Sequence, residues 1–361
     1  MKQSIRVFTE QSRNFFRKYR SFNKLHIQTI YAIGVHVKLI FFTFTQSPRI
    51  VILALYYNSF LGGLMKKGVF FCLSVCVGAG LLMSACTSSK KDGMYAYTQT
   101  DVEIPANGHV IPATLCIPDG SSRFPAVVML HGTASNRNEA GDGYRKAAPV
   151  LAEKYGIATI RIDFMGNGDS KADYTGYTFT SAVADAVKAA QYIGSLKNID
   201  SSRIGVMGWS QGGTIALLAC ARHGDIFKSA VTWAGAPKLN DGDFFTEADY
   251  KEAQKNGFFV MEFDWRSPLN VSLQWCKDVM STDVLAEFAR FTGPVLAIAG
   301  TQDTAVNPEW STKIKEVSHN PKSKTVFIEG MEHTFNVFSE PNFASLYIAV
   351  DETGSFFADT L

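Results

Sequence analysis

A serine set among glycines is the residue of this sequence whose surroundings point most directly to chemistry. Ser210 lies at the centre of Gly-Trp-Ser-Gln-Gly, between an apolar segment typical of a strand and a segment, Gln211 to His223, typical of a helix. A serine at such a sharp turn holds its hydroxyl clear of the sheet, and flanking glycines avoid collisions there. We therefore predict that Ser210 is a nucleophile. The alternative is a tight turn with an incidental serine.

A serine hydroxyl needs a base, and the sequence offers one in a suitable position. The base is usually a histidine held by a carboxylate, in the chain order Ser, Asp, His. Asp303 follows an apolar strand-like segment 93 residues past Ser210, and His333 follows the next such segment 30 residues further on. The carboxyl ends of parallel strands share one sheet edge, so the three side chains should meet there. Taken alone, either partner would more often be structural.

The same chemistry requires hydrogen-bond donors for the negatively charged oxygen of a tetrahedral intermediate. The backbone N–H of Gln211 is suited to this because it opens the predicted helix, where the dipole favours negative charge. A second N–H should come from the loop after the strand that ends at His131-Gly132, and Thr133 is the candidate. Gly132 lets the backbone come close, and His131 is expected to be structural. The alternative for this loop is a plain turn.

The elements that must position these residues alternate between strands and helices. Residues 101–118 are typical of two strands joined by a turn at Asn107-Gly108. Helices are expected over residues 143–155, 179–196, 211–223 and about 341–361. Such alternation predicts an α/β fold with a mostly parallel sheet and helices on both faces.

One segment, residues 237–292, interrupts this alternation. It contains no strand-like run and is rich in aromatic residues, among them Phe244, Phe245, Trp265 and Trp275. We interpret it as an inserted helical cap. Its aromatic side chains could line a pocket for an aromatic or acyl group, or they could form the small core of the cap itself.

The sequence predicts no cofactor and no metal. The loop Asp-Phe-Met-Gly-Asn-Gly-Asp-Ser, residues 163–170, lacks the glycine spacing of a dinucleotide site and is expected to be a structural loop near the site. Cys116, Cys220 and Cys276 are widely spaced, so they predict neither a disulfide framework nor a metal motif. Each is expected to be a buried apolar residue.

The charge of the chain is unevenly distributed. Residues 1–85 hold 11 Lys and Arg residues and one acid, whereas residues 86–361 hold 24 basic and 32 acidic residues, a net charge of −8. The larger part is therefore acidic and has no basic stripe, so nucleic acid is not expected as a partner.

Residues 65–86 follow the pattern of a secretory signal peptide. Two lysines after Met65 precede an apolar run and small residues, and the segment ends in Leu-Met-Ser-Ala-Cys. This ending resembles the lipobox of bacterial lipoproteins, which implies lipidation of Cys86 and a polar tether over residues 87–94. The protein is then expected to be exported and lipid-anchored in the bacterial cell envelope. An uncleaved transmembrane anchor is the alternative.

Residues 1–64 precede this complete signal. We interpret them as a spurious or non-globular extension, with Met65 as the true start. The alternative is a second membrane segment around residues 26–61, although His36, Lys38 and Arg49 would make that span costly.

The remaining residues, 95–361, form the predicted catalytic domain and resemble the α/β-hydrolase superfamily. The segments HGTASNRNE, RIDFMGNGDS, GWSQGG, GTQDTAV and GMEHTF are similar to the cinnamoyl (feruloyl) esterase branch, which neighbours dienelactone-hydrolase-like and serine-aminopeptidase-like hydrolases. The resemblance implies an eight-stranded sheet with a small cap between strands 6 and 7. It also implies ester hydrolysis through an acyl-serine intermediate.

This resemblance implies catalytic roles for Ser210, Asp303 and His333, and oxyanion roles for the N–H groups of Thr133 and Gln211. The sequence departs from the branch at Thr133, where an aromatic residue is usual, and at Asn167, where histidine is frequent. The identity of the acyl group is therefore left open.

We expect a serine hydrolase that cleaves carboxylic esters of small molecules, with aromatic or short acyl esters as candidates. A serine peptidase that acts on short peptides is an alternative on the same fold. A non-catalytic binding protein of the cell envelope is a second alternative, and it would be expected to have lost part of the triad.

Overall fold

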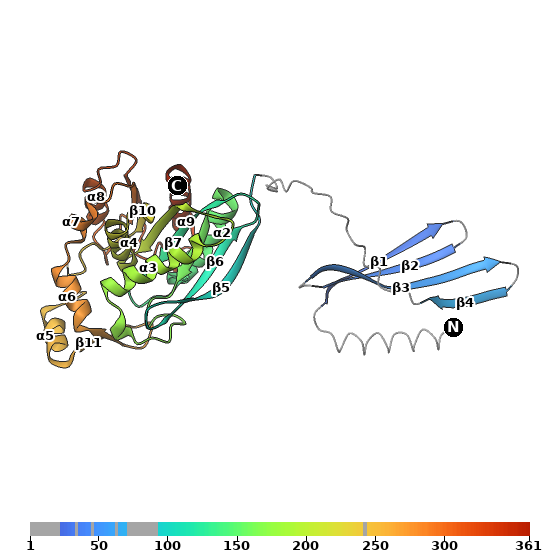
Figure 1. The fold of residues 1–361 in the computed structure, drawn as a ribbon, viewed down its shortest axis with the longest axis horizontal. Helices are drawn as coiled ribbons and strands as arrows, with labels where there is room; N and C mark the ends of the chain where they lie inside the picture. Colours follow the sequence, from blue (N-terminus) through green and yellow to red (C-terminus); the bar gives the residue numbers. More distant parts are fainter. Residues whose placement is uncertain (1–21, 33–34, 45–46, 62–63, 71–92, 241–243) are drawn as a thin grey trace. The chain divides into compact units, whose positions relative to one another are not determined.

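The computed structural model describes residues 93–240 and 244–361, together with the backbone of four strands between residues 22 and 70 (Figure 1). The chain divides into two compact units, residues 1–84 and 85–361. Within the described ranges, no helix combines the length and apolar character needed to cross a bilayer.

The first unit contains an antiparallel sheet whose strands follow one another in chain order. These strands are β1 (Phe22–Ala32), β2 (Val35–Phe44), β3 (Ser47–Leu61) and β4 (Leu64–Phe70). Residues 1–64 are interpreted above as a spurious or non-globular extension, and no strands are expected there. The difference has a simple physical reason, because the region is rich in Ile, Val, Phe and Tyr, which favour strands. β4 includes the first residues of the predicted signal peptide, whereas residues 71–86, with most of its apolar run and Cys86, lie outside the described residues.

The second unit is built on an eight-stranded sheet, as predicted. Its strands are β5 (Tyr97–Pro105), β6 (Val110–Pro118), β7 (Phe124–Leu130), β8 (Ala158–Ile162), β9 (Ile199–Trp209), β10 (Phe227–Trp233), β13 (Val295–Gly300) and β14 (Lys324–Ile328). They lie in the order β14-β13-β10-β9-β7-β8-β6-β5. β5 and β6 pair antiparallel, as does β6 with β8, and the other pairs are parallel. The carboxyl ends of β7, β9, β13 and β14 therefore meet at one edge.

Helices cover both faces of this sheet (Figure 1). α2 (Gly143–Tyr155) and α9 (Ala344–Thr360) share one hydrophobic core with the sheet, and α3 (Phe179–Gly194), α4 (Gln211–Arg222) and α8 (Glu309–Glu316) share the other. Strand β7 shows why both faces are covered. Val128 belongs to the core shared with α3, α4 and α8, whereas its neighbours Val127 and Met129 belong to the core shared with α2 and α9. Short 3₁₀ helices occupy Ala140–Asp142 and Tyr174–Gly176.

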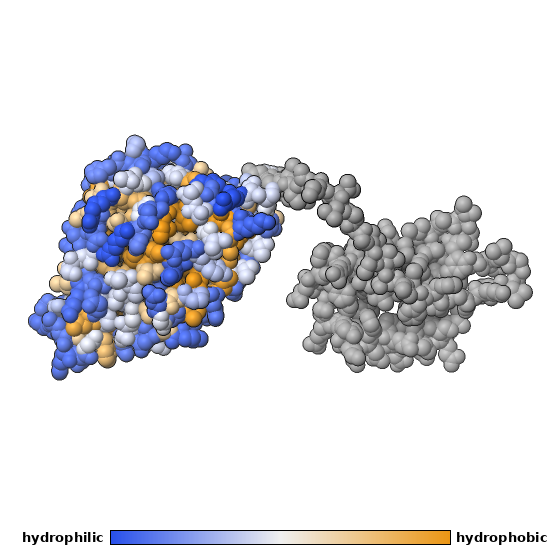
Figure 2. All heavy atoms as spheres, viewed as in Figure 1, coloured by the Kyte–Doolittle hydropathy of each residue, from blue (hydrophilic) through white to orange (hydrophobic). Residues whose placement is uncertain are grey.

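Polar side chains cover most of the face of this unit that Figure 2 shows, with hydrophobic patches between them. The three cysteines Cys116, Cys220 and Cys276 are buried and unbonded, as expected. The unit therefore depends on apolar packing between its sheet and its helices rather than on covalent cross-links among the described residues.

The cap lies between β10 and β13, the sixth and seventh strands of the sheet. It contains α5 (Glu247–Asn256), β11 (Phe258–Met261), β12 (Leu269–Ser272), α6 (Leu273–Ser281) and α7 (Val284–Phe288). The prediction of a purely helical cap is wrong in one respect, because β11 and β12 pair as an antiparallel hairpin. Each strand has only four residues, too few to produce a recognisable alternation in the sequence.

The aromatic residues of the cap divide between the two interpretations that the sequence leaves open. Phe245, Phe259 and Trp275 are almost fully buried, with the rings of Phe245 and Trp275 edge to face at 5.4 Å. They form the small core of the cap. Phe244 and Trp265 instead remain exposed and line a pocket beside Ser210.

Candidate active site

Ser210 occupies a strained turn between β9 and α4. Its backbone angles are φ 54° and ψ −121°, a region that costs an ordinary residue on the order of 1–3 kcal/mol. Its N–H donates to the Trp233 carbonyl at 2.9 Å, and its carbonyl accepts from the N–H groups of Gly213 at 2.9 Å and Ala236 at 3.2 Å. Hydrogen bonds to β10 and to the segment after it therefore hold the turn in this conformation.

Glycines surround the serine because the backbone packs on itself here. A Cβ on Gly208 would overlap the Gly212 carbonyl, and a Cβ on Gly212 would overlap the Leu130 carbonyl at the end of β7. A Cβ on Gly213 would lie 2.7 Å from the Cα of Gly235. Gly208 and Gly212 are the flanking glycines of the pentapeptide, as predicted, and Gly213 allows α4 to approach the segment after β10.

Asp303 and His333 follow β13 and β14 and are joined by a hydrogen bond. The distance from His333 Nδ1 to Asp303 Oδ2 is 2.8 Å, and Asp303 Oδ1 accepts from the N–H groups of Ala305 at 2.9 Å and Val306 at 2.8 Å. The Asp303 side chain is fully buried, and that of His333 is 23% exposed. Because the carboxylate accepts, His333 donates from Nδ1 and keeps the lone pair of Nε2 for a proton.

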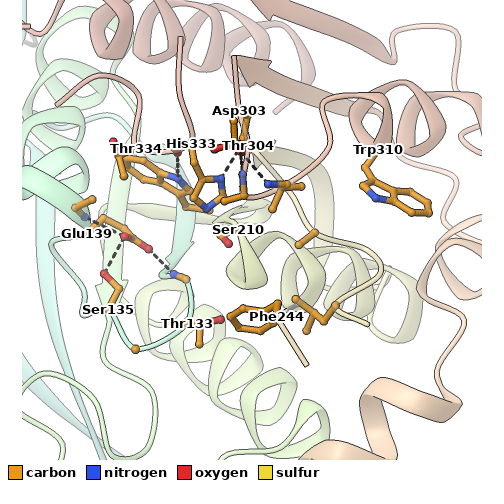
Figure 3. A pocket seen from close by; sticks show the side chains of 18 of the residues that line it. Thr133, Ser135, Glu139, Ser210, Phe244, Asp303, Thr304, Trp310, His333 and Thr334 are labelled. Atoms are coloured by element: carbon orange, nitrogen blue, oxygen red, sulfur yellow. Dashed lines mark hydrogen bonds and ion pairs between the residues drawn. The ribbon is translucent and has the colours of Figure 1, made fainter. Parts of the chain in front are cut away.

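The Asp303–His333 pair and Ser210 line the same pocket (Figure 3). Among the described residues, no hydrogen bond joins the Ser210 hydroxyl to His333. Such a bond is often long in a ligand-free site and tightens when substrate binds. The structure thus brings the three residues to one edge of the sheet, and their catalytic roles remain predictions.

Two contacts that sequence reasoning missed hold the histidine loop in place, one against the nucleophile turn and one against the end of β13. The indole N–H of Trp209, the residue before Ser210, donates to the His333 carbonyl at 3.0 Å. At the end of β13, a Cβ on Gly300 would overlap the Met331 carbonyl. A tryptophan beside the serine and a glycine at a strand end are the only signals in the sequence for these contacts.

The two predicted oxyanion donors lie on segments that are bonded to each other. Thr133 Oγ1 donates to Oε1 of Gln211 at 2.9 Å, and Gln211 is fully buried. This bond fastens the loop after β7 to the first residue of α4. In the described part of the chain, neither the Thr133 N–H nor the Gln211 N–H donates a hydrogen bond to protein. Both donors are therefore available to an oxyanion, a role that remains a prediction.

A buried carboxylate shapes the loop that carries Thr133. Glu139 accepts from the Gly132 N–H, from Ser135 Oγ at 2.8 Å and from the Ala140 N–H at 3.0 Å. The Gly132 N–H is thus already occupied, whereas the Thr133 N–H next to it is available. Sequence reasoning missed Glu139, because nothing in the local pattern separates it from a solvated acid.

His131 joins the ends of β7 and β8, in keeping with the structural role expected for it. Its Nδ1 donates to the Gly132 carbonyl at 2.7 Å, and its Nε2 accepts from the Phe164 N–H at 3.1 Å. These bonds define the neutral tautomer, and burial lowers the pKa of His131. This histidine therefore holds the loop in place and carries no proton to the site.

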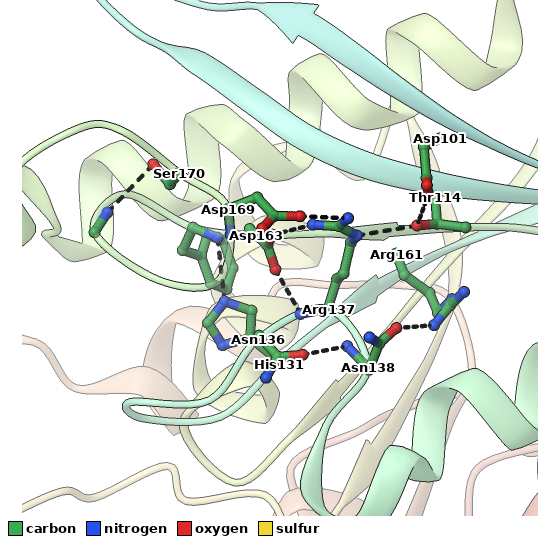
Figure 4. A network of polar contacts seen from close by, with 12 residues as sticks. Asp101, Thr114, His131, Asn136, Arg137, Asn138, Arg161, Asp163, Asp169 and Ser170 are labelled. Atoms are coloured by element: carbon green, nitrogen blue, oxygen red, sulfur yellow. Dashed lines mark hydrogen bonds and ion pairs between the residues drawn. The ribbon is translucent and has the colours of Figure 1, made fainter. Parts of the chain in front are cut away.

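A polar network behind the site binds the loops after β7 and β8 to each other (Figure 4). Arg137 forms ion pairs with the buried Asp163 and, at 2.7 Å, with Asp169. Its Nε also donates to Thr114 Oγ1 at 3.0 Å. A Cβ on Gly168 would overlap the Asp163 carboxylate. The second loop is thus structural, which agrees with its interpretation from the sequence.

The pocket beside Ser210 has a volume of about 1130 Å³. Its aromatic lining residues are Trp209, Phe244, Phe263, Trp265, Trp310 and Phe338. The two carboxylates that line it, Glu139 and Asp303, are both bonded within the protein, and Lys238 is its one lysine. The described lining therefore suits an apolar or aromatic group and offers no free carboxylate to a cationic substrate.

Comparison with known sequences connects this site to hydrolases. Residues 144–320, just under half of the chain, match the prolyl oligopeptidase family. The matched range includes Ser210 and Asp303 and ends before His333. The chain is 31% identical over 150 residues to a 2,6-dihydropseudooxynicotine hydrolase of Paenarthrobacter nicotinovorans, which covers 40% of this chain and 37% of that protein. The chain spans less than half the length of three curated relatives that it matches.

Solved structures share the fold. Est1E from Butyrivibrio proteoclasticus, determined with ferulic acid bound, has a TM-score of 0.59 and 22% identity over 72% of this chain and 98% of that chain. A puromycin-hydrolyzing peptidase of Mycobacterium tuberculosis has a TM-score of 0.55 and 17% identity over 94% of this chain and 48% of that chain. The strand order and these structural matches together show that the second unit has the α/β-hydrolase fold.

Proposed function

We propose that the protein is a serine hydrolase that cleaves carboxylic esters through an acyl-enzyme. The single observation that carries the proposal is the hydrogen-bonded Asp303–His333 pair, which lines one pocket with a serine held at φ 54°. Asp303 orients the imidazole so that Nε2 can accept a proton, and the strained turn presents the hydroxyl.

The proposed reaction has two halves. Ser210 Oγ attacks the ester carbonyl carbon while His333 Nε2 takes the hydroxyl proton, and the N–H groups of Thr133 and Gln211 bind the resulting oxyanion. The intermediate collapses, the ester C–O bond breaks, and the alcohol leaves with the proton from His333. Water then attacks the acyl-serine with His333 as base, which releases the acid and restores the serine.

The pocket supports esters with an aromatic or short acyl group. Phe244, Phe263 and Trp265 line the space beside Ser210, and contacts between aromatic rings stabilise an aromatic ligand by more than their buried area. The ferulic acid bound to Est1E is an aromatic acid of this kind. We therefore place feruloyl-type and short acyl esters first among candidate substrates.

Ser210→Ala tests the proposal directly. The variant should lose turnover of p-nitrophenyl acetate and labelling by a fluorophosphonate probe, while its thermal unfolding stays close to that of the wild type. Ser195→Ala removes an exposed serine hydroxyl that donates to the Tyr192 carbonyl at 2.7 Å and should leave both activities unchanged. A Ser210→Ala protein that still turns over the ester would refute the assignment.

A peptidase acting on short peptides is the second candidate, and the match to the prolyl oligopeptidase family favours it. A peptidase that binds a free amino terminus would need an unengaged carboxylate, and neither carboxylate of the described lining is unengaged. Turnover of matched feruloyl, acetyl and aminoacyl p-nitroanilides and esters separates the candidates. Faster cleavage of the amides would favour the peptidase. An inert protein, unlabelled by the probe, would favour a non-catalytic binding role.

We also propose that the protein is exported and anchored to the bacterial envelope through a lipid on Cys86. The support is the sequence alone, with lysines, an apolar run and the lipobox-like ending in order over residues 65–86. Mass spectrometry of the mature N-terminus tests it. A diacylated Cys86 as first residue is expected, and an N-terminus upstream of Met65 would overturn the proposal.

A further inference from the structure

A side chain of the cap reaches across to the loops that surround the proposed oxyanion hole. Arg266 lies in the connection between β11 and β12 and is partly buried. Its Nη1 donates to the Ala134 carbonyl at 2.9 Å and to Asn167 Oδ1 at 3.0 Å. One guanidinium nitrogen thus joins the cap to the loop after β7 and to the loop after β8.

Both partners are fixed so that they face this guanidinium. Ala134 is buried and has φ 59°, a left-handed conformation that a non-glycine residue adopts only when its surroundings impose it. Asn167 is 2% exposed, and its Nδ2 donates to the Met165 carbonyl at 3.2 Å. The amide is therefore oriented with its oxygen toward Arg266. Two buried acceptors aimed at one cationic side chain indicate a defined contact rather than a chance approach.

The contact between Arg266 and the two loops lies next to the proposed oxyanion donor and next to the aromatic residues of the pocket. Ala134 directly follows Thr133, whose N–H is the proposed oxyanion donor. Arg266 directly follows Trp265, and both Trp265 and Phe263 line the pocket. The guanidinium therefore connects the aromatic wall of the pocket with the loop that must hold an N–H in the correct position.

We propose that Arg266 is a positioning residue that clamps the cap to the oxyanion loop, so that the Thr133 N–H is held where the oxyanion forms. This inference rests on the proposed function of Ser210 and its partners. Because the oxyanion exists only after attack, loss of the clamp should lower kcat and change KM little. A residue needed only to build the substrate pocket would instead raise KM.

Arg266→Met and Asn167→Ala test the clamp with p-nitrophenyl acetate, whose acyl group is too small to depend on the aromatic wall. Each variant should lower kcat about tenfold, less than the loss of a whole oxyanion donor, with KM within about twofold. The double variant should be no more than about twofold slower than either single variant, because both remove the same contact. Arg145→Met is the matched control, since the Arg145 side chain is largely exposed and forms a 3.9 Å ion pair with Asp142, away from Arg266 and its partners.

The affinity for a phosphonate ester analogue of the intermediate gives an independent readout. It should fall by the same factor as kcat in Arg266→Met, while thermal unfolding of the variant shows a folded protein. If Arg266→Met keeps the kcat of the wild type, or if its loss of activity appears only as a higher KM, the clamp is overturned. Labelling of Ser210 by the probe would in that case still support the proposed function. Loss of probe labelling in the wild type itself would instead overturn the proposed function.

Discussion

The bond between the Trp209 indole and the His333 carbonyl leads to a sharp prediction about catalysis. The loop that carries His333 continues into Phe335 and Asn336, both left-handed at φ 56° and 54°. The Trp209 ring packs on Phe335 with centroids 4.6 Å apart, and its N–H spans 3.0 Å to the loop. Trp209→Phe keeps an aromatic ring at this position and removes the donor, so the loop loses one of its anchors to the nucleophile turn.

The expected magnitude follows from the loss of one hydrogen bond. A neutral N–H···O=C bond contributes about 0.5–1.5 kcal/mol, and a carbonyl left unpaired raises the cost to about 1–3 kcal/mol. If a loss of 1–2 kcal/mol falls on the histidine loop, the competent arrangement is depopulated about 5- to 30-fold. We therefore expect kcat/KM of Trp209→Phe for p-nitrophenyl acetate to fall within that range.

Trp233 provides a matched control for the same substitution. Its ring lies 5.4 Å from that of Trp209 in the same aromatic cluster, and its N–H donates to Thr353 Oγ1 on α9 at 2.8 Å. Trp233→Phe should lower the free energy of unfolding by a similar amount and leave kcat/KM within about twofold. Urea unfolding and ester turnover measured on both variants decide the matter. Equal losses of kcat/KM in the two variants would refute the reasoning.

Three further predictions concern the triad, the sheet edge and pH. Asp303→Asn should lower kcat by about 10³- to 10⁴-fold with little change in thermal unfolding, because the amide can stabilise the wrong tautomer of His333; near-normal turnover would contradict the proposed role. Gly300→Ala should reduce the free energy of unfolding by about 3 kcal/mol or more, measured by urea unfolding, since its Cβ would overlap the Met331 carbonyl; a variant of normal stability would contradict this packing. Burial raises the pKa of Asp185 from 3.8 to about 6 beside His109, so its contribution to stability is complete below about pH 4 and is lost as the pH rises through 6. Urea unfolding of the wild type and Asp185→Asn at pH 4 to 7 should show that the free energy of unfolding of the wild type falls by up to about 1.4 kcal/mol per pH unit relative to that of the variant. A difference between the two free energies that stays constant with pH would exclude a link between stability and the ionisation of Asp185.

The sequence by itself determined the features that depend on neighbours along the chain. The glycines around Ser210 show in a single pentapeptide, and Asp303 and His333 each stand just after an apolar strand. The alternation of strands and helices predicts a parallel sheet, and parallel strands bring their carboxyl ends to one edge. These regularities are local, so they predicted a mostly parallel sheet and proposed the triad without any knowledge of contacts, whereas the resemblance to α/β-hydrolases implied the number of strands.

Only the tertiary structure decided which distant groups hold that site together. Trp209 and His333 are separated by 124 positions, and Arg266 and Ala134 by 132. Hydrogen bonds of this kind depend on distances and angles that arise when loops pack, and no spacing in the sequence encodes them. The cap hairpin escaped prediction for the same reason, because each four-residue strand is stabilised chiefly by its partner. Local patterns thus identified the reacting groups, and packing between remote segments determined how firmly each of them is held.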